Sequence, residues 1–280
     1  MLFNSPELRI PNTRVFAAST YSDQTKVPLF GSTAFSLPFE RSINLSQLQR
    51  SSWLRKRLLV WRCGLRRSLK HMLVTFSSIQ WLVFLAKGDR QLLGLPRYEL
   101  LTNGIFINYI EVERTPGAHD DFYRRVLLVN IMQDYISFYR NHMQTAAIVT
   151  CRIDSDDILH PRYCALLSSC IRLQTDSLLD VTYAFPHGLE FDIEKGTLIP
   201  KMWPEPPFIA RYEKHCSNSP LKTVWEKSHD QQDLNKNYAQ IMTTEPVWCI
   251  TLGNDNIQNS SSMYPYCRAY GMNITDIFRA

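Results

Sequence analysis

A mostly apolar segment that ends in a cluster of carboxylates constrains the fold more than any other part of the sequence. Residues 146–153 are rich in β-branched side chains, and Asp154, Asp156 and Asp157 follow within four positions. The segment predicts a buried strand, and Pro161 predicts the first position of a helix after it. Crowded carboxylates are costly unless a positive group lies beside them, and ligands bind at the carboxyl ends of strands in α/β sheets. The sequence therefore predicts a ligand or cation site at this acidic turn.

The spacing of Asp154 and Asp156 fits a divalent cation that is shared with phosphate. Side chains two apart point to the same face if the strand continues through both, and Mg²⁺ takes only one or two carboxylates besides phosphate oxygens and waters. A calcium loop needs Gly and Glu where Leu159 and Ala165 stand, and an Asp-x-Asp phosphatase needs a small hydroxyl residue in place of Ile158. The remaining alternative is an acidic loop that caps the next helix, a stabilisation of about 0.3–1 kcal/mol.

Composition places the chain among ordinary globular proteins, but its charge is uneven. Hydrophobic residues make up 45% and charged residues 20% of the 280 residues, and the net charge is +5. Residues 50–70 hold eight basic residues and no acidic one. We favour the solvated face of a helix whose apolar side carries Leu58, Leu59, Trp61, Leu65 and Leu69. The alternative is contact with nucleotide phosphates or with an anionic membrane surface. No aromatic platform for bases is interleaved, so no nucleic-acid partner is expected.

The cysteines favour a reducing compartment, and we expect a cytoplasmic protein. There are seven, an odd number, and none forms a Cys-x-x-Cys pair, which argues against a zinc site and a disulfide framework. Cys151, Cys164 and Cys170 are predicted to pack in the core. No signal peptide is evident, and the longest apolar run, 72–86, is too short to span a bilayer.

Alternating strand and helix patterns predict an α/β fold. Strands are expected at 79–86, 105–112 and 146–153, and helices at 53–76, 121–143 and 161–174. A meander of short strands follows at 181–185, 188–192 and 197–200, then long loops over 204–244 and a last strand at 246–252. This order favours a mostly parallel sheet flanked by helices, with a mixed β-rich C-terminal half. We expect one domain over 51–280, while 1–50 form a leader, or a first strand near 14–21 and its loop.

Motifs along the chain resemble, in their order, those of one enzyme family. They are Thr150-x-Arg152-x-Asp154-Ser155-Asp156-Asp157, Ser68-Leu69 before Trp81-Leu82-Val83, Phe185-x-x-Gly188, Pro207-Phe208 with Glu213, Thr223-Val224 with His229, and Trp248 with Gly253 and Asn256. Over roughly residues 53–260 the chain resembles the rhamnosyltransferase family of bacterial GT-A-type glycosyltransferases, which has an Asp-x-Asp motif. Two positions depart from the family: the Thr-Arg-Phe-like signature of its first strand has its nearest match at residues 18–21, and Leu252 replaces a His.

The resemblance implies a GT-A-like, Rossmann-like fold with a nucleotide-sugar-binding half at 51–175 and an acceptor half at 176–280. It implies that a sugar, rhamnose by the family's name, moves from a nucleotide-sugar donor to the hydroxyl of a saccharide or another acceptor. Mn²⁺ or Mg²⁺ would be held by Asp154 and Asp156, with His229 as a third metal or phosphate ligand.

The same resemblance implies three contacts to the nucleotide. Arg152 either pairs with the neighbouring acids or reaches a phosphate. Asp154 binds the ribose or the metal. Asp89, which follows the predicted strand at 79–86, is expected at the nucleotide base or ribose, although a turn role suits it equally well.

Candidate catalytic residues are Asp156, Asp157 and Glu226. Glu213, Glu226 and Asp230 all remain open as the general base that deprotonates the acceptor hydroxyl. Two other functions also remain open. One is a non-catalytic carbohydrate-binding or interaction protein on a decayed transferase scaffold, and the other is a different Mg²⁺-dependent nucleotide or phosphate enzyme.

Overall fold

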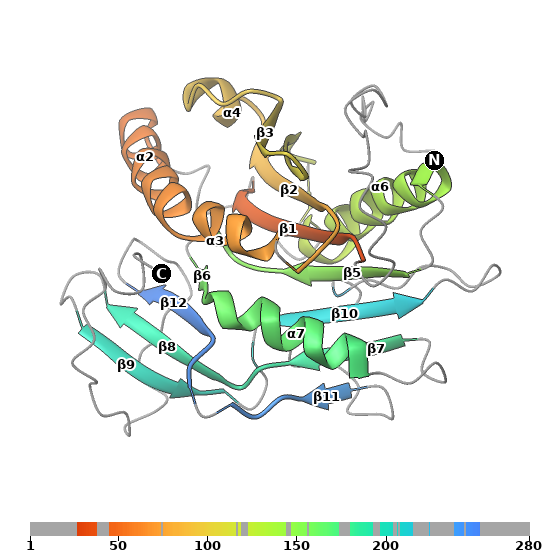
Figure 1. Ribbon diagram of the computed structural model, residues 1–280. Helices are drawn as coiled ribbons and strands as arrows, with labels where there is room; N and C mark the ends of the chain where they lie inside the picture. The colour runs from red at the N-terminus through yellow and green to blue at the C-terminus, as the bar shows by residue number, and fades with distance from the viewer. Residues whose placement is uncertain are drawn as a thin grey trace.

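The chain folds into two β-sheets with helices on both faces of the larger one (Figure 1). The computed structural model describes residues 27–37, 45–73, 75–115, 117–118, 123–143, 147–155, 157–173, 180–192, 197–203, 206, 208–214, 224, 238–243 and 245–252. The predicted fold class is confirmed, because the large sheet is mostly parallel and is flanked by helices.

The large sheet has the strand order β11-β7-β10-β5-β1-β2-β4-β3. Its parallel centre consists of β5 (Ala147–Arg152), β1 (Leu29–Ser36), β2 (Ile79–Ala86) and β4 (Ile105–Val112). An antiparallel strand, β3 (Tyr98–Thr102), forms one edge. On the other side β10 (Ile209–Lys214) is antiparallel to both β5 and β7 (Asp180–Ala184), and β11 (Tyr238–Gln240) is parallel to β7. Every residue of β2 is buried, as expected of a strand covered on both faces.

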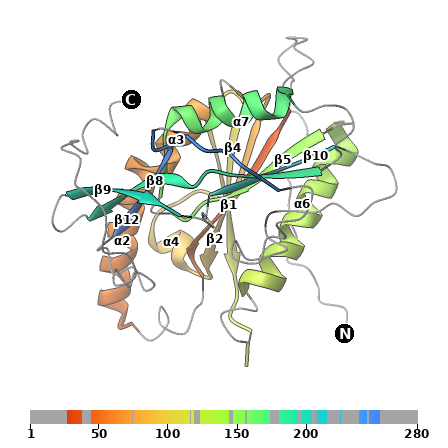
Figure 2. The ribbon, with the colours of Figure 1, turned by 90° about the horizontal axis from the view of Figure 1, so that it is seen from below.

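Helices cover the two faces of this sheet separately. The first face carries α2 (Gln47–Cys63), α3 (Leu65–Met72) and α7 (Pro161–Leu173), while α6 (Leu128–Met143), after a π-helical turn at Tyr123–Leu127, packs on the second. Figure 2 shows α6 across the strands from α2. A single turn, α4 (Asp89–Leu92), follows β2. No helix in the described ranges is long and apolar enough to cross a membrane.

The small sheet adjoins the large one and has the order β6-β12-β8-β9. Its strands are β6 (Ile158–Leu159), β12 (Trp248–Leu252), β8 (His187–Asp192) and β9 (Thr197–Met202). The Trp248 indole joins the two parts: its Nε1 donates to the Phe185 carbonyl at 2.6 Å, and its ring stacks on Phe208 with centroids 4.7 Å apart. A Cβ on Gly188 would lie 2.1 Å from this ring, so only Gly fits there.

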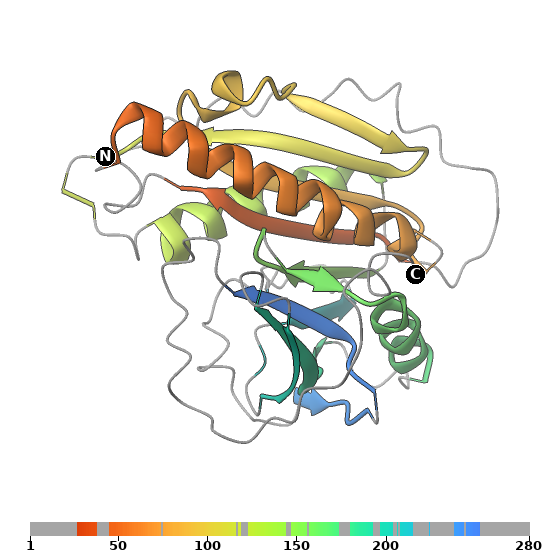
Figure 3. The ribbon, with the colours of Figure 1, turned by 90° about the vertical axis from the view of Figure 1, so that its left-hand side faces the viewer.

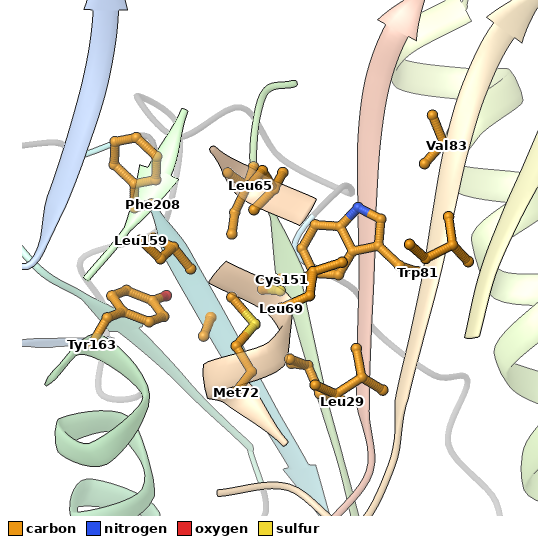
Figure 4. Packing of buried hydrophobic residues seen from close by; sticks show 14 of the residues in the cluster. Leu29, Leu65, Leu69, Met72, Trp81, Val83, Cys151, Leu159, Tyr163 and Phe208 are labelled. Carbon is orange, nitrogen blue, oxygen red and sulfur yellow. The ribbon is translucent and has the colours of Figure 1, made fainter. Parts of the chain in front are cut away.

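The core under α3 and α7 is built around Trp81. Figure 4 shows its ring pointing from β2 across β1 toward Cys151 and Leu69. The ring lies over Gly31, where an added Cβ would meet it at 2.0 Å. Cys151 and Cys164 are buried in this same core and Cys170 packs against it, which confirms their predicted packing role.

The first strand that the structure describes was not predicted. It is β1, at Leu29–Ser36, and it lies between β2 and β5 in the middle of the sheet. The predicted position, 14–21, lies outside the described residues. The segment LFGSTAFS has no long apolar run, but pairing on both edges satisfies its backbone, so Ser32 and Thr33 can be fully buried there. The segment 1–50 thus supplies a central strand.

The predicted helix at 53–76 is two helices with an earlier start. Ser46 caps α2 at its N-terminus: its hydroxyl accepts from the Gln49 amide, and the Gln49 side-chain oxygen accepts from the Ser46 amide. Gly64 then separates α2 from α3. A Cβ there would lie 3.0 Å from the Val60 carbonyl and 3.1 Å from the Ile158 side chain, so the break lets the small sheet approach.

Two strand predictions in the C-terminal half were wrong. The region 204–244 was predicted as loops but contains β10 and β11. Strand β10 was missed because its charged residues, such as Arg211 and Glu213, do not follow an apolar strand pattern. The predicted meander of three strands is not formed, because β7 and β8 belong to different sheets. Of these three strands, only β8 and β9 pair with each other. The edge strand β3 was also missed, within the Gly- and Pro-containing segment before 105–112.

We predict that Gly31→Ala lowers the free energy of unfolding by about 3 kcal/mol, because the buried Trp81 ring cannot retreat from an added methyl group. Urea unfolding measures the change. Gly94→Ala is the control: it has φ +63 with open space around it, and so loses only about 1 kcal/mol of backbone strain. Equal losses in the two variants would contradict the packing argument.

Candidate functional site

The acidic turn lies at the carboxyl end of β5 and leads directly into β6, so it joins the large sheet to the small one (Figure 3). The carboxyl ends of β1 and β2 lie at the same edge, because these strands are parallel to β5. The strand ends at Arg152 and does not continue through Asp154. The shared strand face expected for Asp154 and Asp156 is therefore not formed, and Asp156 lies outside the described residues.

Hydrogen bonds to β1 hold the start of this turn. The Ile153 amide donates to the Ser32 carbonyl at 3.2 Å, and the Thr33 hydroxyl donates to the Ile153 carbonyl at 2.8 Å. The Trp81 indole in turn donates to the Thr33 hydroxyl at 3.0 Å. Since all these groups are buried, each bond is made in a low-dielectric setting and is costly to break. The turn is thus fixed relative to three strands.

The described residues of the turn have different environments. Asp154 is exposed, whereas Ser155 and Asp157 are buried, at 0% and 6% exposure. Within the described structure the Ser155 hydroxyl has no hydrogen-bond partner. Leaving a buried hydroxyl unsatisfied costs about 1–3 kcal/mol. The turn therefore offers one exposed carboxylate, next in sequence to a fully buried hydroxyl.

Asp157 faces the interior of the protein. Its amide donates to the Asp154 carbonyl at 3.2 Å and closes the turn. Burial raises the pKa of the Cys249 thiol on β12, and the carboxylates of Asp157 and Glu190 raise it further. Asp157 thus lies against the small sheet, while Asp154 points to solvent.

Asp89 lies just beyond the carboxyl end of β2 and is held by Arg50 of α2. The guanidinium binds both carboxylate oxygens, with Nε to Oδ1 at 3.0 Å and Nη2 to Oδ2 at 2.6 Å. Only 3% of Asp89 is exposed. This ion pair ties the first turn of α2 to the edge of the sheet that carries the acidic turn. The predicted nucleotide contact of Asp89 stays a prediction.

Arg152 lies beside the first of two buried serines of β1. Arg152 is the last residue of β5, is half-buried, and is the register partner of Ser32. Ser32 and Ser36 are buried, and in the described ranges their hydroxyls have no hydrogen-bond partner. These hydroxyls were missed from the sequence; their only signal is a set of small polar residues inside a strand.

Among the other predicted residues, only Glu213 lies in the part of the chain that the structure describes. Glu226, His229 and Asp230 lie outside the described residues. Glu213 is buried on β10 opposite Ile148, four positions before Arg152, which is about 13 Å along the strand. Glu213 therefore lies away from the carboxyl edge.

A divalent metal fits the turn only with ligands from elsewhere. Among the residues that the structure describes, no three His, Cys, Asp or Glu side chains form a group that could hold a metal ion. Among the described residues of the turn, only Asp154 offers an exposed carboxylate. One or two carboxylates suffice for Mg²⁺ when a diphosphate supplies further oxygens, so the exposed Asp154 can serve as one of its ligands.

Comparison with known proteins gives solved structures that superpose on this chain only weakly. No family model matches the sequence, and no curated protein matches it. A structure assigned as a nucleotide-diphospho-sugar transferase from Desulfovibrio desulfuricans G20 has 11% identity and a TM-score of 0.36, over 84% of this chain and 89% of that one. The inositol-1-phosphate CTP transferase from T. maritima has 8% identity and a TM-score of 0.35, over 91% and 96%. At these TM-scores neither likeness bears on the activity of this chain.

We predict that Thr33→Val loosens the acidic turn. The change leaves the Trp81 indole and the Ile153 carbonyl without their buried partner, which costs about 1–3 kcal/mol. Hydrogen exchange should become faster at the amides of Ile153 and Asp157, while Thr33→Ser, which keeps the hydroxyl, retains the protection. Unchanged exchange in Thr33→Val would rule out this role of the hydroxyl.

A pH dependence follows from His160, which precedes α7. Its amide donates to the Val247 carbonyl at 3.0 Å, and its Nδ1 accepts from the Arg162 amide at 3.1 Å. Burial, together with the charges of Arg162 and His71, lowers the pKa of His160 below the ordinary 6.5. The unfolded chain therefore takes up this proton first as the pH falls through 6.5, and stability is lost from there down to the folded pKa.

We predict that His160→Asn makes the loss of stability at falling pH smaller, because Asn keeps an acceptor for the Arg162 amide but does not titrate. Urea unfolding between pH 7 and pH 5 measures the slope of stability against pH. A slope as steep in His160→Asn as in the wild type would show that His160 does not cause it.

Proposed function

We propose that this protein is a glycosyltransferase that moves a sugar from a nucleotide-sugar donor to an acceptor hydroxyl at the acidic turn. The observation that carries the proposal is the position of the turn. It leaves a parallel strand at the carboxyl edge of the sheet, where ligands of α/β folds bind, and it exposes Asp154 beside the buried hydroxyl of Ser155. The resemblance of the motifs to the rhamnosyltransferase family adds the substrate class, with rhamnose as the proposed sugar.

The difficult charge of such a transfer develops on the leaving diphosphate. Mn²⁺ or Mg²⁺, when bound by Asp154 and Asp156 together with the diphosphate, would neutralise this charge. His229 is proposed as a third ligand. Arg152, at the end of β5 next to β1, can add a positive charge toward the phosphates.

The protein's own contribution is a fixed position for these groups. The hydrogen bonds from Trp81 through Thr33 to Ile153 set the turn before the donor binds, so little ordering is required at the moment of reaction. Asp89 is proposed to orient the nucleotide base or ribose through the ion pair that it forms with Arg50. Glu226 is proposed as the general base and Asp156 as a residue close to the reacting diphosphate. The buried Asp157 closes the turn from its interior side.

We predict that nucleoside diphosphates raise the melting temperature of the wild type in the presence of Mn²⁺, since a ligand that binds only the folded state stabilises it by about 2.7 kcal/mol at a hundred times its Kd. Asp154→Asn should lose most of this shift. Asp134→Asn is the matched control, because Asp134 is also an exposed carboxylate but lies on α6. Equal shifts in all three proteins would contradict the proposed site.

Turnover of the donor then separates an enzyme from a binding protein. Wild-type protein with Mn²⁺ and dTDP-rhamnose, or another nucleotide sugar, should release the nucleoside diphosphate, and Asp156→Ala should not. Metal-linked binding with no release from any donor and acceptor would favour the decayed scaffold instead. Release that persists unchanged in Asp156→Ala would overturn the assignment of the acidic turn.

A further inference from the structure

The outward face of α2 carries two exposed leucines. Leu48 is 82% and Leu59 64% exposed. They are three helical turns apart and therefore lie on one stripe of the helix. The sequence pattern had placed Leu59 on the buried side with Leu58, but only Leu58 is buried. The helix thus has apolar residues on both sides, which a purely solvated face does not require.

Basic residues surround these leucines on the same face. Arg55, Lys56 and Arg62 are exposed. In the part of the chain that the structure describes, Arg55 and Lys56 have no acidic partner, while the charge of Arg62 also acts on the carboxylate of Glu99 and lowers its pKa. We call Leu48, Arg55, Lys56, Leu59 and Arg62 the α2 outer face.

Other basic residues of the same helix are used inside the protein. Arg50 binds Asp89, and the Arg57 guanidinium lies over the rings of Trp53 and Phe35, 5.5 and 6.0 Å from their centroids. The helix therefore divides its cations between internal contacts and an outer face.

We propose that the α2 outer face docks on an anionic lipid surface. Exposed cations on a helix are attracted to anionic headgroups, and apolar side chains beside them enter the boundary between headgroups and acyl chains. Single-stranded nucleic acids bind to aromatic side chains on which bases stack; on the outward stripe the apolar residues are leucines. The paired leucines and cations favour lipid as the partner.

Docking would also set how the candidate site is oriented relative to the lipid surface. Figure 3 shows α2 running along the outside of the large sheet. Its first turn reaches the carboxyl edge, because Arg50 binds Asp89 there. If the proposed function holds, the donor site lies beside the lipid surface and suits an acceptor hydroxyl on a lipid-linked molecule; docking itself does not depend on that function.

Vesicle co-sedimentation of the full chain tests the proposal. We predict binding to vesicles of phosphatidylcholine mixed with phosphatidylglycerol and much weaker binding to phosphatidylcholine alone. The triple variant Arg55→Gln/Lys56→Gln/Arg62→Gln should bind anionic vesicles roughly a hundredfold more weakly at low salt. Leu48→Ser/Leu59→Ser should also weaken binding, and its deficit should persist at high salt, where charge attraction is screened.

The control removes the same number of exposed charges elsewhere, with Arg97→Gln/Arg114→Gln/Arg172→Gln. It should bind anionic vesicles nearly as the wild type does. Equal weakening in both triple variants, or binding to an oligonucleotide with none to vesicles, would overturn the proposal. Circular dichroism confirms that each variant is folded. No readout here uses sugar transfer, so failure of docking is distinguishable from failure of the proposed function.

Discussion

The contact between the Trp81 ring and the bare backbone of Gly31 is the constraint on which the rest of the structure depends. It lets β1 and β2 pair with a large ring lying across them. The same indole donates to Thr33, which donates to the first carbonyl after β5. One side chain therefore couples the packing of the core to the position of the acidic turn.

The motifs that resemble the rhamnosyltransferase family are largely packing positions. Gly188, Phe185 and Phe208 all contact Trp248, where the small sheet meets the large one. Ser68 of α3 bonds to both the amide and the carbonyl of Leu159 in β6. These residues fix how two sheets meet, and the acidic turn lies at that junction. Their order along the chain thus describes a scaffold that holds the acidic turn.

The sequence predicted those elements whose signal is local. Strands β2 and β4 are long apolar runs, and Pro161 opens α7 as expected. Strand β1 could not be found this way, because its small polar residues are buried only through neighbours that come later in the chain. Strand β10 was missed because it carries charged residues; one of them, Arg211, pairs with Asp180 of the neighbouring β7. For the candidate site, the turn was located, but the exposure of Asp154 and the hydroxyls of β1 required the fold.

The hydrogen bond from Thr33 to Ile153 spans 120 positions of the chain. Strand β1 leads the sheet in sequence, yet its second neighbour, β5, arrives only after β2, β4 and α6. Contacts of such long range form slowly, since the loop between them must close first. Until β5 arrives, one edge of β1 is open to other strands, which favours aggregation. Synthesis of this protein therefore passes through a stage in which the edge of β1 that will pair with β5 has no partner strand.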